Sequence, residues 1–93
     1  MSLSEFSLQG KKALVVGARR NMGKAFALGL AEAGADVAVT DLNTESGQLK
    51  SVSEEIMAMG RKSICIKTDI SSHMDVRNMV NKVMQEFDGI DIL

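Results

Sequence analysis

The amino-acid sequence predicts an α/β fold of the doubly wound kind, in which helices cover both faces of a parallel sheet. Three observations indicate this class: short apolar runs without polar alternation, stretches of helical apolar spacing between them, and a regular alternation of the two. A continuous apolar run is typical of a strand covered on both faces, and short connections favour right-handed crossovers onto one sheet. With 45% hydrophobic and 25% charged residues, the 93-residue chain has the composition of a single domain with a packed core.

The first strand and the first helix are predicted between residues 12 and 34. Residues 12–16 form a short apolar run that ends at Gly17, as expected for a buried strand. Residues 22–33 are strong helix formers, and Gly34 supplies a stop signal. The predicted inner face of this helix consists of apolar residues three and four apart, namely Met22, Ala25, Phe26, Leu30 and Ala33.

The same alternation continues to the end of the chain. Residues 36–40 and 63–67 are predicted as strands, the second with Cys65 as a small core residue. A helix follows each, and the later one is expected to begin at a cap supplied by Ser71 or Ser72. The predicted core positions are Leu49, Val52, Ile56 and Met59 in one helix and Val76, Met79, Val80, Val83, Met84 and Phe87 in the other. Residues 90–93 are expected to open a fourth strand, and strands ordered 3-2-1 would otherwise leave one flank of the first strand unpaired.

The turn between the first strand and the first helix is predicted to carry the chemistry. A diphosphate needs backbone N–H donors, close approach of the backbone and the positive end of a helix dipole, which a glycine-bearing turn supplies together. Gly17 allows a sharp exit from the strand, Gly23 lacks a side chain in the first helical turn, and Asn21 tolerates a positive φ between them. A Walker A loop is rejected, because Met22 stands where its second glycine should be and Lys24 is followed by no hydroxyl residue.

The spacing G-x-x-x-G-x-G, with Asn21 at the middle glycine, is one of several features by which the chain resembles the short-chain dehydrogenase/reductase family. The other matching pieces, in order, are residues 33–35, Asp41, residues 68–70 and residues 87–93. The resemblance implies the N-terminal portion of a Rossmann-like fold, and an oxidoreductase that transfers hydride between NAD or NADP and an alcohol or carbonyl substrate. The expected cofactor-binding residues are Gly17, Arg19, Arg20, Asn21, Met22, Gly23, Asp41, Leu42, Asp69 and Ile70, of which the resemblance assigns the last two to adenine.

Two features bear on the choice between NAD and NADP. Asp41 follows the second strand, where its carboxylate can accept hydrogen bonds from the adenosine ribose hydroxyls and would repel a 2′-phosphate. Arg19 and Arg20 favour the other coenzyme, because the family often holds the 2′-phosphate with a basic residue in this turn. We expect NAD to be favoured, with NADP as the alternative, since like-charge opposition at a partly buried site costs more than a flexible arginine gains.

Catalytic residues are not expected in this chain. The family uses a Ser, a Tyr-x-x-x-Lys pair and an Asn, whereas this sequence contains no Tyr and stops before the segment that follows the fourth strand. We therefore expect residues 1–93 to be a partial NAD(P)-binding Rossmann domain, truncated before the catalytic segment and inactive by itself. The alternative is a non-catalytic nucleotide-binding or interaction module, and the reading frame beyond Leu93 would separate the two.

Charge and composition bear on partners and location. The net charge of −1 argues against a dedicated nucleic-acid partner, and a single cysteine argues against a multi-cysteine metal site. The absence of an apolar run of ~20 residues argues against a membrane span, and the N-terminus lacks a signal-peptide pattern, so a cytoplasmic location is expected. Besides the dinucleotide and a small-molecule substrate, the expected partner is a second copy of the protein, because family members are commonly oligomers and the bare strand flank favours association.

Overall fold

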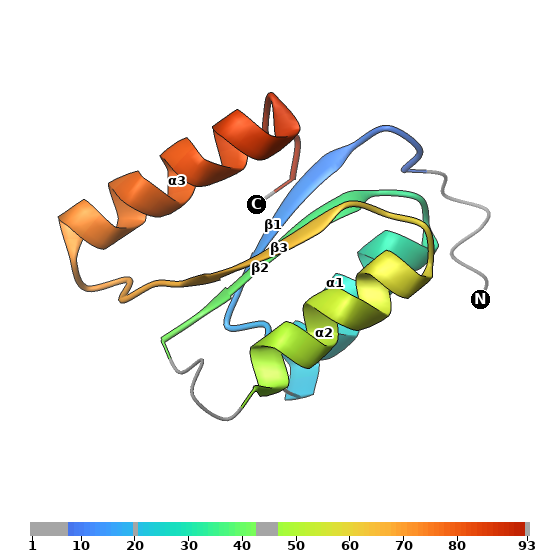
Figure 1. Ribbon diagram of the computed structural model, residues 1–93, viewed down its shortest axis with the longest axis horizontal. Helices are drawn as coiled ribbons and strands as arrows, with labels where there is room; N and C mark the ends of the chain where they lie inside the picture. Colours follow the sequence, from blue (N-terminus) through green and yellow to red (C-terminus); the bar gives the residue numbers. More distant parts are fainter. Residues whose placement is uncertain (1–7, 20, 43–46, 93) are drawn as a thin grey trace.

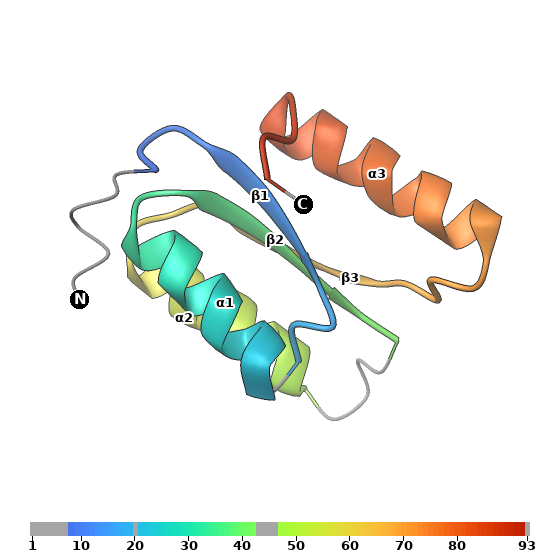
Figure 2. The same cartoon turned by 180° about the vertical axis from the view of Figure 1, so that it is seen from behind.

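The computed structural model describes residues 8–19, 21–42 and 47–92, which form a parallel sheet between two layers of helices (Figure 1). In chain order the elements are β1 (Lys12–Val16), α1 (Asn21–Glu32), β2 (Asp36–Asp41), α2 (Gln48–Ala58), β3 (Ser63–Lys67) and α3 (His73–Phe87). Helices α1 and α2 lie side by side on one face of the sheet, and α3 lies on the other (Figure 1, Figure 2). The predicted α/β fold class is confirmed.

The three strands run parallel with β2 in the centre. In the register of β1 and β2, Ala13 lies beside Val37. Ile92 pairs with Ala13 on the opposite flank of β1, where the Leu14 N–H donates to the Ile92 carbonyl at 2.9 Å. The predicted order 3-2-1 is confirmed, and the chain returns to the free flank of β1 as expected for the start of a fourth strand.

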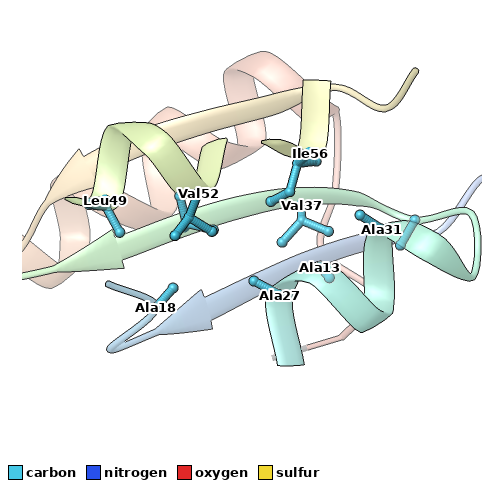
Figure 3. Packing of buried hydrophobic residues seen from close by; sticks show 10 residues of the cluster. Ala13, Ala18, Ala27, Ala31, Val37, Leu49, Val52 and Ile56 are labelled. Carbon is cyan, nitrogen blue, oxygen red and sulfur yellow. The ribbon is translucent and has the colours of Figure 1, made fainter. Parts of the chain in front are cut away.

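The core between the sheet and helices α1 and α2 combines alanines with longer side chains (Figure 3). Its buried members are Ala13, Ala18, Ala27, Ala31, Ala35, Val37, Val39, Leu49, Val52 and Ile56. The fully buried members from helix α1 are alanines, with Leu28 and Leu30 partly buried beside them, so its backbone lies close to β1 and β2. Helix α2 fills the space above β2 with larger residues. This close approach of α1 positions the turn that precedes it at the end of β1.

The predicted inner face of α1 is only partly correct. Ala33 is buried and Leu30 packs partly buried against the core, but Ala25 is exposed, and Met22 and Phe26 are 73% and 61% exposed. The buried stripe of the helix contains Ala27 and Ala31 instead. Both stripes have helical spacing, so periodicity cannot choose between them, and the larger side chains favour the wrong one. The start of α1 packs directly on the backbone of the turn before it, which leaves room only for small side chains between α1 and β1. We call Met22, Phe26 and Leu30, which border an apolar groove along the helix, the apolar stripe of α1.

Three other predicted core residues are exposed: Met59, Met84 and Cys65. Met59 is the C-terminal cap of α2 and lies beyond its buried stripe. Helix α3 meets the sheet along a single stripe, and Met84 lies outside it. Cys65 lies in β3, an outer strand with no neighbour on one side within the described residues. The remaining predicted positions of α3 are confirmed, with Met79, Val83 and Phe87 buried and Val76 and Val80 partly buried.

The amino-terminal edge of the sheet is closed by a carboxylate at the start of β2. Asp36 Oδ2 accepts a hydrogen bond from Lys12 Nζ at 2.9 Å, and Asp36 Oδ1 accepts one from the Lys62 backbone N–H at 2.9 Å. Burial acts to raise the pKa of Asp36, but the Lys62 and Lys12 donors outweigh it and hold this pKa below its ordinary value. These contacts tie the starts of all three strands together.

Candidate functional site

The turn between β1 and α1 is anchored to the end of β2. Gly17 has a φ of 73°, a conformation in which other residues are strained, and this turns the chain out of β1. The backbone N–H groups of Gly17 and Ala18 donate to the Thr40 carbonyl at 2.8 and 3.1 Å. The turn therefore lies at the carboxyl edge of the sheet, where doubly wound folds bind their ligands.

Helix α1 packs on this turn through Gly23. A Cβ at Gly23 would overlap the Gly17 carbonyl oxygen and come within 2.8 Å of its carbon. The missing side chain therefore serves packing within the turn itself. Helix α1 begins at Asn21, so its first backbone N–H groups, which have no partners within the helix, open at this turn. Arg20, predicted as a site residue, lies outside the described residues.

A second cluster joins the turn to β2 and α2. The Arg19 backbone N–H donates to Asp41 Oδ2 at 3.3 Å, and Arg19 Nε lies 3.8 Å from Asp41 Oδ1. Arg19 Nη1 donates to the side-chain oxygen of Gln48, the first residue of α2, at 2.8 Å. The structure thus brings together two residues with opposed expected effects on coenzyme choice. It also adds Gln48, which no motif in the sequence indicates.

Asp69, just after β3, has partners of its own. Asp69 Oδ1 accepts hydrogen bonds from the Ser71 hydroxyl at 2.6 Å and from the Ser71 N–H at 2.9 Å, and these bonds hold the pKa of Asp69 below its ordinary value. The Asp69 N–H donates to Asp75 Oδ2 at 3.0 Å, and the Asp75 N–H donates to Ser72 Oγ, the cap of α3. Ser72 is therefore the cap, while Ser71 stabilises the ionised Asp69. The Asp-x-Ser spacing, typical of a local side-chain turn, was the available signal.

Three apolar members of the predicted site are exposed around this edge. Met22 is the second residue of α1, Leu42 follows β2 and Ile70 follows Asp69, and all three residues are more than half exposed. Ligand sites usually combine apolar surface with a few polar groups. The described residues contain no group of three His, Cys, Asp or Glu side chains that could hold a metal ion.

The polar atoms that lack partners also gather here. Among the described residues, the buried side-chain atoms without a hydrogen-bond partner are Arg19 Nε, Thr40 Oγ1 and Thr68 Oγ1. Arg19 lies in the turn, Thr40 precedes the last residue of β2, and Thr68 follows β3. An unpaired buried polar group costs about 1–3 kcal/mol, so such groups are rare in folded proteins. All three lie near the carboxyl edge of the sheet.

Comparison with known proteins identifies relatives along nearly the whole chain. Residues 11–93 match the model of the family described as short chain dehydrogenase. A short-chain dehydrogenase/reductase of Armillaria gallica is 42% identical over 85 residues, which make up 91% of this chain and 33% of that protein.

No helix formed by residues 8–19, 21–42 and 47–92 combines the length and apolarity needed to cross a bilayer.

Solved structures give the same result. A short chain dehydrogenase from Burkholderia cenocepacia in complex with NADP matches with a TM-score of 0.85 and 42% identity, covering 91% of this chain and 35% of that one. NAD+-bound xylitol dehydrogenase matches with a TM-score of 0.83 and 33% identity, covering 90% of this chain and 32% of that one. The chain therefore spans about a third of the length of these relatives. It belongs to the short-chain dehydrogenase family.

Proposed function

We propose that this chain forms the coenzyme-binding part of an NAD(P)-dependent oxidoreductase that transfers hydride between the nicotinamide dinucleotide and an alcohol or carbonyl substrate. The observation that carries the proposal is the glycine-bearing turn at the carboxyl edge of the sheet, where the first backbone N–H groups of α1 open. Family membership supports it, as do the NADP and NAD+ complexes of two relatives.

The turn would hold the diphosphate. The backbone around Gly17, Asn21, Met22 and Gly23 opens at the N-terminus of α1, where unpartnered N–H groups and the helix dipole favour an anion. Arg20 would add a positive charge. When bound, the nicotinamide ring supplies the hydride chemistry, and the residues of this turn bind and orient the dinucleotide.

The ends of β2 and β3 would hold the adenosine. The Asp41 carboxylate is an acceptor for ribose hydroxyls, and Leu42 beside it offers apolar surface. Asp69 is kept ionised by Ser71, which suits an acceptor for the adenine amino group, while the exposed Ile70 side chain can cover the ring.

NAD is the coenzyme that we propose as preferred. The Asp41 side chain is only 17% exposed, so its charge is incompletely screened and opposes a 2′-phosphate. The Arg19 side chain, which is 18% exposed, offsets part of this charge, but its Nε atom lies 3.8 Å from Asp41 Oδ1. The preference is therefore expected to be moderate.

Calorimetric titration of the full product of the gene that encodes this chain tests both coenzyme binding and the preference for NAD. NADH should bind more tightly than NADPH. Asp41→Ala should improve NADPH binding about fivefold or more relative to NADH, as expected for the removal of roughly 1 kcal/mol of repulsion. Glu54→Ala, which removes an exposed carboxylate from α2, is the control and should leave the ratio unchanged. An unchanged ratio in Asp41→Ala would remove Asp41 from the site, and binding of neither coenzyme would overturn the proposed function.

We further propose a homo-oligomeric protein. Family membership supports this, because members of the short-chain dehydrogenase family are commonly oligomers. The apolar stripe of α1 would suit the second candidate function, a non-catalytic interaction module. Light scattering should give a dimer or tetramer, and a monodisperse monomer would contradict the assembly. Coenzyme oxidation with carbonyl substrates would support the enzyme over the module.

A further inference from the structure

Gln48 lies where the glycine turn, β2 and α2 meet. Its side-chain oxygen accepts a hydrogen bond from Arg19 Nη1 at 2.8 Å, across 29 positions of sequence. Arg19 belongs to the turn, and Asp41 is the last residue of β2. The contact therefore fixes the far end of an arginine whose backbone is already bonded to Asp41.

This arrangement holds the guanidinium beside the carboxylate without completing the pair. Arg19 Nε lies 3.8 Å from Asp41 Oδ1, beyond hydrogen-bond distance, and it is buried without a partner. The two side chains are 18% and 17% exposed, so solvent screens their charges only in part. The guanidinium also carries further N–H donors on its terminal nitrogens, which can bond a phosphate.

We propose that Gln48 is a positioning residue for coenzyme selection, which keeps Arg19 beside Asp41 so that the adenosine ribose site tolerates a 2′-phosphate. This inference rests on the proposed function. The held guanidinium cancels part of the Asp41 charge and offers a preorganised donor to the phosphate. Without Gln48, Arg19 gains rotamer freedom that phosphate binding must then remove, and Asp41 is less neutralised. Both effects weaken binding of the 2′-phosphorylated coenzyme, whereas neither weakens binding of a ribose diol.

A purely structural tie between α2 and the turn makes a different prediction. If Gln48 served only to hold α2 in place, its removal would disturb ligands with and without the 2′-phosphate equally. Its effect would also persist when Arg19 is absent. The ratio of the two affinities and its dependence on Arg19 therefore distinguish a positioning role from a structural one.

The test uses ADP-ribose and its 2′-phosphate derivative, because both probe the adenosine half of the site alone. Calorimetry on the full gene product is expected to show that Gln48→Ala weakens the phosphorylated ligand about five- to tenfold and changes ADP-ribose less than about twofold. Gln48→Met keeps the length and helix propensity of the side chain but lacks the amide oxygen that accepts from Arg19. It should weaken the phosphorylated ligand in the same way as Gln48→Ala. Ser51→Ala, at another exposed position of α2, should change neither affinity.

A double-mutant cycle completes the experiment. In an Arg19→Ala background, Gln48→Ala should have no further effect on the ratio, because the residue acts through Arg19. The inference is overturned if Gln48→Ala and Gln48→Met leave the ratio unchanged, weaken both ligands equally, or still act without Arg19. These results leave the proposed function standing as long as the wild-type protein binds ADP-ribose. If it binds neither ligand, the proposed function fails as well.

Discussion

Strand β2 begins with Asp36 and ends with Asp41, and each carboxylate faces a base from β1 or from the turn that follows it. At the amino-terminal edge, Lys12 Nζ and the Lys62 N–H both reach Asp36 at 2.9 Å. At the carboxyl edge, Arg19 Nε stays 3.8 Å from Asp41 and has no hydrogen-bond partner. The charged side chains are thus in direct contact at one end of the strand, whereas at the other end they lie farther apart.

The comparison indicates how a structural ion pair differs from a site. Removing charges from water has a cost that only short, well-aligned hydrogen bonds recover. Asp36 meets that condition with donors from two strand starts, and its lowered pKa reflects it. The Arg19 Nε and Asp41 Oδ1 atoms are 3.8 Å apart and form no such short hydrogen bond.

The largest expected effect contrasts two glycines at opposite edges. Gly23→Ala places a Cβ against the Gly17 backbone and should lower the free energy of unfolding by about 3 kcal/mol through overpacking. Gly60→Ala meets no atom within 4 Å and should cost only about 1–2 kcal/mol, because its φ of 83° is unfavourable for alanine. Urea unfolding measures both. Equal losses would show that the turn accommodates a side chain and that α1 is not tightly seated on it.

Next in size is the contrast between the two carboxylates. Asp36→Asn removes an ionised acceptor of two hydrogen bonds and should lower the free energy of unfolding by about 1–2 kcal/mol. Asp41→Asn removes a charge that lies 3.8 Å from Arg19 Nε, a longer ion pair, and should lower the free energy of unfolding by less. Thermal or urea unfolding of the two variants measures both losses in the free energy of unfolding. A larger loss for Asp41→Asn would reverse the assignment of structural and functional ends.

Sequence patterns predicted the strands, their order and the carboxyl-edge location of Asp41 and Asp69, because continuous apolar runs and glycine turns act locally. They could not select the buried stripe of α1, since two stripes share the helical period and close packing on the turn decides between them. They also could not indicate that Arg19 meets Gln48. That contact depends on where α2 begins relative to the turn, which only the assembled sheet determines.

The pH dependence of stability should reveal the same asymmetry. The folded-state pKa of Asp36 lies below its unfolded value of about 3.9, so its stabilising contribution is fully present above that pH and is lost as the pH falls through the folded pKa. Wild type and Asp36→Asn should therefore differ in stability above about pH 5 and converge toward about pH 2. Unfolding curves between these limits provide the check. A gap that persists undiminished in acid would mean that Asp36 acts through packing and not through its charge.

The smallest expected effect concerns Asp69, the carboxylate that we propose as an adenine acceptor. Ser71→Ala removes the hydroxyl that bonds Asp69 Oδ1 at 2.6 Å, so the pKa of Asp69 should rise toward its ordinary value, as followed by carboxyl-carbon NMR during an acid titration. Ser72→Ala is the matched control, because it removes the cap of α3 at a cost of about 1 kcal/mol in stability and leaves both Ser71 bonds in place. If the two variants shifted the pKa of Asp69 alike, the lowered value would derive from the N-terminus of α3 and not from Ser71. Asp69 would then be ordered by the helix in the way that Asp36 is ordered by its neighbours, and the ionisation of this proposed adenine acceptor would depend on fold geometry instead of on a dedicated serine.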